Sequence, residues 1–167
     1  MKARRILWYE EEIKMKKILI SRCLMGDCCR YDGKSNLVPE IRELAESGLA
    51  VPVCPEQLGG LPTPRTPSEI CGDRVMMRDG TDVTENFRRG AERALAIGLE
   101  QGCVCAVTKA KSPSCGCGRV YDGTFSGTLV SGDGIFVRLL KEAGILVCTE
   151  KDDWQALISE TGLQGTE

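Results

Sequence analysis

Short apolar runs alternate with segments of helical periodicity along this chain, and this alternation constrains the fold more than any other feature. The apolar runs at 18–21, 50–53, 104–108 and 145–148 have the length of buried strands. Helical patterns are predicted over 39–47, 84–101, 133–143 and 152–161. Strands that alternate with helices favour a parallel sheet. We therefore predict an α/β fold, a single domain with a mostly parallel sheet of about four strands and helices on both faces.

The remaining segments give weaker signals. Residues 55–72 contain four prolines and are expected to form a long loop, and residues 121–127 a turn. A short strand is possible at 74–77. Residues 1–15 read as a charged N-terminal helical extension, with a second possible start at Met15. The expected organisation is this extension, 1–15, followed by one α/β domain, 16–167.

The cysteine and histidine counts limit the chemistry. The 167 residues include 10 cysteines and no histidine, which excludes Cys/His zinc sites and Ser–His–Asp triads. The N-terminus lacks the apolar core of a signal peptide, so thiols in a reducing, cytoplasmic compartment are expected. No apolar run approaches the roughly 20 residues of a membrane span. The net charge of −2 gives no reason to expect a nucleic-acid polymer or a membrane as partner.

Three cysteines occupy equivalent places in the predicted fold. Cys23, Cys54 and Cys115 each follow the C-terminal end of a predicted strand, in loops rich in proline or glycine. Ligands of open α/β sheets bind beyond those strand ends, so the pattern favours one shared site. Zinc sites usually show Cys-x2-Cys pairs, which this sequence lacks. Singly placed thiolates fit an iron–sulfur cluster better.

The other cysteines have different settings. Cys103, Cys105 and Cys148 lie in strand patterns and are predicted to be core residues. Cys117 pairs with Cys115 as Cys-x-Cys and is either a ligand or a spare thiol.

Polar residues near the three cysteines suggest chemistry. Glu56 follows Cys54 by two residues, and beside a cluster it is a natural proton-transfer group when histidine is absent. Ser112 precedes Pro113, which restricts its backbone and can aim its hydroxyl. Lys109 and Lys111 either lie on the surface or offset the negative charge of a cluster.

Several motifs in fixed order carry a family resemblance. They are Ser21-Arg22-Cys23-Leu24-Met25-Gly26, Arg30-Tyr31-Asp32-Gly33, Val51-Pro52-Val53-Cys54-Pro55-Glu56, Gly59-Gly60-Leu61-Pro62-Thr63-Pro64-Arg65, Asp82-Val83-Thr84 and Ser112-Pro113-Ser114-Cys115-Gly116. Over residues 16 to about 149 the chain resembles the thiouracil desulfidase family, long known only as a domain of unknown function.

The resemblance implies a cofactor and site residues. It implies a 4Fe-4S iron–sulfur cluster held by Cys23, Cys54 and Cys115, with a fourth iron that has no protein ligand. It also implies that Glu56 and Ser112 serve catalysis. The expected activity converts a small thiolated nucleobase of thiouracil type to its oxo form by hydrolysis, without net redox change.

Two other functions stay open at this stage. The first is a non-enzymatic domain that binds a cluster or zinc and has a structural or redox-sensing role. The second is a metal-free sulfur carrier that uses Cys115 and Cys117. An open loop crevice containing Glu56 favours the enzyme, because structural metal sites are closed.

Overall fold

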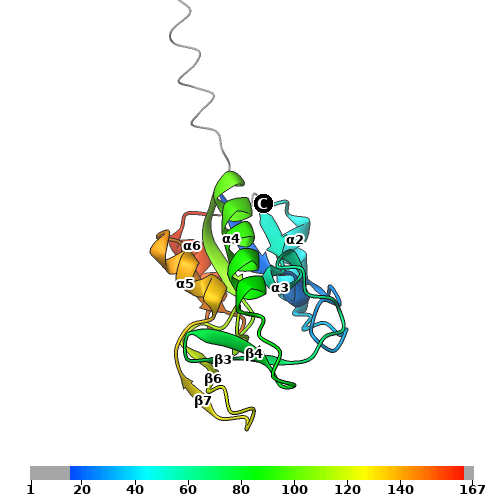
Figure 1. Ribbon diagram of the computed structural model, residues 1–167. Coiled ribbons are helices and arrows are strands. Elements are labelled where there is room, and N and C mark those ends of the chain that lie inside the picture. The colour runs from blue at the N-terminus through cyan, green and yellow to red at the C-terminus, as the bar shows by residue number, and fades with distance from the viewer. Residues whose placement is uncertain (1–15, 164–167) are drawn as a thin grey trace, which may run out of the picture.

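Four short strands form the centre of the fold in the computed structural model, which describes residues 16–163 (Figure 1). Their spatial order is β2 (Ala50–Val53), β1 (Lys17–Ser21), β5 (Cys103–Thr108) and β8 (Leu146–Thr149), and all neighbours run parallel. The middle of β1, residues 18–20, is completely buried. Burial on both faces explains why these strands are continuous apolar runs.

Helices cover both faces of the sheet. α2 (Pro39–Glu46) and α6 (Trp154–Glu160) place Ile41 and Ile158 in one core with Ile18 and Ile20 of β1. The opposite core contains Leu19 together with residues of α4 (Thr84–Glu100) and α5 (Ile135–Glu142). The predicted α/β domain with a four-stranded parallel sheet is therefore confirmed.

The expected structureless loop at 55–72 was wrong, whereas the expected turn at 121–127 and the short strand at 74–77 are confirmed. Residues 55–72 contain α3 (Pro55–Leu58) and β3 (Ser68–Cys71), and β3 pairs with β4 (Arg74–Met77). The predicted turn at 121–127 is the tip of a hairpin formed by β6 (Arg119–Tyr121) and β7 (Leu129–Ser131). Elements of three or four residues are too short to show a periodic pattern of apolar residues. Proline at the first position of α3 is compatible with a helix start.

The two hairpins are attached to the α/β core by a third apolar cluster. Leu61, Ile70, Val75 and Val120 pack there with Phe87 of α4. In Figure 1 both hairpins lie at the same end of the molecule, below α4. This attachment places the hairpins beside the loops that follow the strands.

α3 lies directly against the backbone of α4. A Cβ atom added to Gly90 of α4 would stand 1.8 Å from the Pro55 carbonyl oxygen, and one added to Gly59 would stand 2.0 Å from the Asn86 carbonyl oxygen. Only glycine permits this approach at either position. The close contact fixes α3, which begins directly after Cys54.

The predicted extension, 1–15, lies outside the described residues. Within residues 16–163, no helix combines the length and the apolar character needed to cross a bilayer.

Candidate active site

A cavity of about 540 Å³ lies where β1, β2 and β5 end. Its lining includes Ser21 at the end of β1, Val53 at the end of β2, and the loop that begins at Lys109 after β5. Parallel strands bring their C-terminal ends to one edge of the sheet, so loops distant in sequence meet there.

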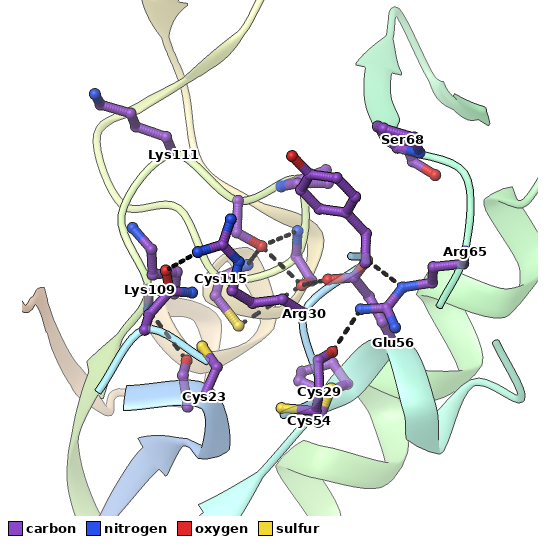
Figure 2. Close-up of a pocket in the computed structure, with 18 of the residues that line it drawn as sticks. Cys23, Cys29, Arg30, Cys54, Glu56, Arg65, Ser68, Lys109, Lys111 and Cys115 are labelled. Carbon is purple, nitrogen blue, oxygen red and sulfur yellow. Dashed lines mark hydrogen bonds and ion pairs between the residues drawn. The ribbon is translucent and has the colours of Figure 1, made fainter. Parts of the chain in front are cut away.

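Cys23, Cys54 and Cys115 all line this cavity (Figure 2). Cys23 lies in a 3-10 turn, η1 (Arg22–Met25), directly after β1. Cys54 lies between β2 and α3, and Cys115 belongs to the loop that follows β5. Their side chains are at least nine-tenths buried. The structure thus brings together the three cysteines that sequence position had grouped, while their role as ligands stays a prediction.

The thiols surround the cavity and do not converge on a single point. Within the part of the chain that the structure describes, no three cysteine, aspartate or glutamate side chains are grouped tightly enough to hold one metal ion. All ten cysteines lie in that part, and each is a free thiol.

The loop that carries Cys115 is fixed by Ser112. The Ser112 hydroxyl oxygen accepts hydrogen bonds from the backbone N–H groups of Ser114 (3.2 Å) and Cys115 (3.1 Å). The start of α5 holds the same loop, because the Phe136 N–H donates to the Ser114 carbonyl (3.0 Å). The loop is therefore held by hydrogen bonds within it and by a hydrogen bond from α5.

Glu56, in the first turn of α3, is held at both carboxylate oxygens. Its Oε1 accepts from Arg65 Nε at 3.3 Å, and its Oε2 accepts from the Ser114 hydroxyl at 3.2 Å. The Arg65 side chain is only 3% exposed, and its guanidinium also donates to the Cys29 carbonyl (2.9 Å) and the Thr63 hydroxyl (3.0 Å). A planar guanidinium with several fixed partners holds a carboxylate in one orientation.

Ser114, which was not predicted as a site residue, is the serine that contacts Glu56. The Ser112 hydroxyl lies 3.1 Å from the Ser114 hydroxyl, so a chain of hydrogen bonds joins Glu56 to Ser114 and Ser114 to Ser112. Ser114 Oγ also lies 3.6 Å from Cys115 Sγ. Because a hydroxyl has one proton, Ser114 donates either to Glu56 or to Cys115 at any one time.

Two of the three thiols have a pKa below the ordinary value for cysteine. A hydrogen bond with the Cys29 thiol lowers the pKa of Cys54 to about 7, and the charge of Arg65 acts in the same direction. A hydrogen bond with Cys29 also lowers the pKa of Cys23, with a smaller contribution from the charge of Lys109. Thiolates are the form that binds metal.

The third thiol has the opposite tendency. Burial raises the pKa of Cys115 to about 12, against smaller effects of the hydroxyls of Ser21 and Ser114. A thiol in this environment is expected to ionise only when a bound metal centre compensates its charge.

Four other cysteines and the two lysines can be located in the fold. Cys103, Cys105 and Cys148 are buried in strands, which confirms the core prediction. The Cys117 thiol faces the Val147 carbonyl oxygen at 3.9 Å and is not part of the cavity lining. Lys109 and Lys111 both line the cavity. Lys109 forms an ion pair with Glu150 at 2.7 Å.

Cys29 and Arg65 were missed as site residues. Cys29 is buried, lines the cavity and lies beside both Cys23 and Cys54, but in the sequence it is one of two adjacent cysteines in a polar loop. Arg65 is the last residue of the motif Gly59-Gly60-Leu61-Pro62-Thr63-Pro64-Arg65, and this motif was the signal that could have identified it as a site residue. Contacts across 36 residues, as between Arg65 and Cys29, cannot be read from spacing.

Comparisons with known proteins agree with this geometry. The family model of 2-thiouracil desulfurase matches residues 18–152, which is most of the chain. The chain belongs to the 2-thiouracil desulfurase family. The matched region contains every cavity residue discussed above.

Two known proteins are similar to this chain. Protein YbbK of Bacillus subtilis (strain 168), described as uncharacterized, is 41% identical over 145 residues, which cover 81% of this chain and 96% of YbbK. The solved structure of a [4Fe-4S]-dependent thiouracil desulfidase, TudS (DUF523Vcz), is 42% identical with a TM-score of 0.83. The alignment covers 89% of this chain and all of that one. The similarity therefore extends over the whole α/β domain.

Proposed function

We propose that this protein is an iron–sulfur-dependent desulfidase that converts a thiolated nucleobase of thiouracil type to its oxo form. The observation that carries the proposal is the meeting of Cys23, Cys54 and Cys115 in one cavity with Glu56. Membership of the 2-thiouracil desulfurase family and the similarity to a [4Fe-4S]-dependent desulfidase support it.

The residues present fit a 4Fe-4S cluster held by Cys23, Cys54 and Cys115. Cysteines that bind one cluster bind different irons, so their thiols surround a space and need not meet at a point. Lys109 and Arg65 place positive charge near Cys23 and Cys54, which offsets part of the charge of thiolates. When bound through three cysteines, the cluster would supply an iron without a protein ligand, a thiophilic Lewis acid that polarises a C=S bond.

Glu56 is proposed as the general base. Its carboxylate takes a proton from the water that adds to the thiocarbonyl carbon, and histidine is absent from the sequence as an alternative base. Arg65 holds Oε1, which leaves Oε2 to exchange protons with the Ser114 hydroxyl. Ser112 lies next in the hydrogen-bonded chain and completes a route for the proton.

The overall reaction balances without an electron donor. A C=S group and water give a C=O group and hydrogen sulfide. The water oxygen forms the new bond to carbon, and the sulfur leaves with two protons. The proposed reaction is therefore a hydrolysis.

We infer a cytoplasmic location, because ten free thiols and an oxygen-sensitive cluster suit a reducing compartment. We also infer that residues 16–167 form one cluster-binding domain that acts on small molecules, with 1–15 as an extension.

The test begins with protein purified without oxygen. Iron and sulfide are counted, and turnover of 4-thiouracil is measured on the same sample. Cys23→Ser, Cys54→Ser and Cys115→Ser should each lose most of the iron and the brown absorbance. Cys28→Ser and Cys117→Ser are the matched controls, since Cys28 is exposed and Cys117 lies outside the cavity lining.

Two outcomes would count against the proposal. Iron loss in Cys117→Ser, with iron retained in Cys115→Ser, would show that the ligand assignment is wrong. Full iron content with no turnover of 4-thiouracil or another thiolated base would favour the non-enzymatic cluster domain.

A further inference from the structure

An aromatic ring at a hairpin tip lines the cavity and has no part in the proposed proton transfers. Phe125 lies between β6 and β7, is half-buried, and contributes to the cavity lining. Its backbone φ is +55°, in the left-handed region that residues other than glycine rarely adopt. Such a conformation persists when surrounding contacts impose it, so the contacts of this residue are informative.

Glu69 of β3 supplies those contacts. Its Oε1 accepts hydrogen bonds from the backbone N–H groups of Gly123 (3.0 Å) and Phe125 (3.1 Å). Glu69 is only 8% exposed, and no basic side chain forms an ion pair with it in the part of the chain described. A buried carboxylate needs such hydrogen bonds, and here they tie the hairpin tip to β3.

The hairpin tip is also packed closely on β3. A Cβ atom on Gly123 would stand 2.7 Å from the Ile70 carbonyl oxygen, and the Cys71 thiol donates to the Gly123 carbonyl at 3.4 Å. The guanidinium of Arg78 lies over the Phe125 ring, 5.7 Å from its centroid. The ring is thus held in place by its backbone and by a cation.

We propose that Phe125 is a ring-stacking residue for a planar heterocyclic substrate, and that Glu69 is the positioning residue that fixes it. The inference rests on the proposed function and deepens it. The chemistry assigned to Glu56 acts on a C=S group alone and does not distinguish one thioamide from another. A fixed aromatic ring in the same cavity recognises the π-face of a heterocycle, whatever its substituents.

The test separates binding of the ring from the chemistry at sulfur. Uracil has the ring of the proposed substrate without its sulfur, so its dissociation constant, measured by equilibrium dialysis on anaerobic, cluster-loaded full-length protein, reports ring contacts. Phe125→Leu should weaken uracil binding and raise the KM for 4-thiouracil by about 5- to 150-fold, the scale of one base–aromatic stack. kcat and iron content should stay close to those of the wild type. Phe125→Tyr should retain binding.

Glu69 is tested by a conservative pair. The amide oxygen of Glu69→Gln can still accept from both N–H groups, so this variant should bind uracil like the wild type. Glu69→Ala should resemble Phe125→Leu, with faster hydrogen exchange at Gly123 and Phe125. Val130→Ala, an exposed change on β7 outside the cavity lining, is the control for general effects on the hairpin.

The outcomes are distinguishable. Unchanged uracil binding and KM in Phe125→Leu would overturn the stacking role and leave the desulfidase proposal standing. A wild type that binds uracil through Phe125 but does not turn over 4-thiouracil would support the stacking role and sink the proposed reaction. A wild type that neither binds uracil nor turns over 4-thiouracil would overturn both.

Discussion

At the scale of single residues, the two oxygens of Glu56 have separate partners. Arg65 holds Oε1 and the Ser114 hydroxyl bonds Oε2, so the carboxylate reaches the cavity in a defined orientation. Glu56→Gln keeps the shape of the side chain and removes its ability to accept a proton as a base. Turnover of 4-thiouracil should fall by roughly 10²–10⁴-fold. Iron content, measured on the same sample, should not change.

The control for this experiment is substrate affinity. KM should change little in Glu56→Gln, because the proposed role lies in the chemical step. Near-normal turnover in a fully loaded variant would exclude Glu56 as the base and leave the cluster assignment untouched.

Substitution of Ser114 and of Ser112 should have different effects. Ser114→Ala removes the hydroxyl that bonds Glu56, so turnover should fall by about tenfold or more with the iron retained. Ser112→Ala removes an acceptor used by the backbone N–H groups of Ser114 and Cys115, and each hydrogen bond is worth about 1 kcal/mol. That variant should lose thermal stability or iron as well as turnover. Equal iron content and equal melting temperatures in both variants would contradict this division.

Sequence position predicted that the three cysteines and Glu56 lie together, because each follows a strand or lies in a short motif in the loop after it. It did not separate Ser114 from Ser112, because the contact with Glu56 spans 58 residues and depends on how the loop folds over α3. Glu69 and Phe125 gave no signal at all. Their contact links two hairpins that were not predicted.

At the scale of elements, the contact between α3 and α4 positions Glu56 and the end of the chain segment that carries Cys54. Gly90→Ala should destabilise the protein, although alanine favours helices by about 1 kcal/mol over glycine. The added methyl group meets the Pro55 carbonyl at 1.8 Å, and overpacking of this kind typically costs about 1–3 kcal/mol. Chemical denaturation measures the change in the free energy of unfolding.

A comparison on the same helix isolates the packing effect. Glu92 of α4 is exposed, and Glu92→Ala should change the free energy of unfolding by no more than about 0.5 kcal/mol. Because α3 follows Cys54 and carries Glu56, Gly90→Ala should also lower iron retention. A more stable Gly90→Ala protein with full iron content would show that α3 can move away without consequence.

The four strands of the central sheet were predicted because each is a continuous apolar run, and α4 because its apolar residues repeat with a helical period. Four other short elements were not predicted. α3, β3, β6 and β7 have three or four residues each and are stabilised by tertiary contacts such as the cluster around Phe87. Local sequence holds little information about such elements.

At the scale of the whole molecule, the sheet, its helices and every proposed site residue lie within residues 16–163. Removal of residues 1–14, so that the chain starts at Met15, should leave iron content and 4-thiouracil turnover nearly unchanged. The reason is that the family match begins at residue 18, after the removed segment. Soluble yield, iron content and turnover of the shortened protein measure this. A large loss of soluble protein would show that the segment contributes to folding.

The strand order has a consequence for the order of events during synthesis. β1 pairs with β2 on one side and with β5 on the other, so Cys23 and Cys54 can be brought together well before Cys115 has been made. Translation at about 5–20 residues per second separates Cys54 from Cys115 by several seconds. A nascent chain in that interval contains two of the three proposed thiols and lacks the third. Delivery of a cluster to this protein should therefore require a released or nearly complete chain, and stalled chains that end before residue 115 should carry no stable cluster.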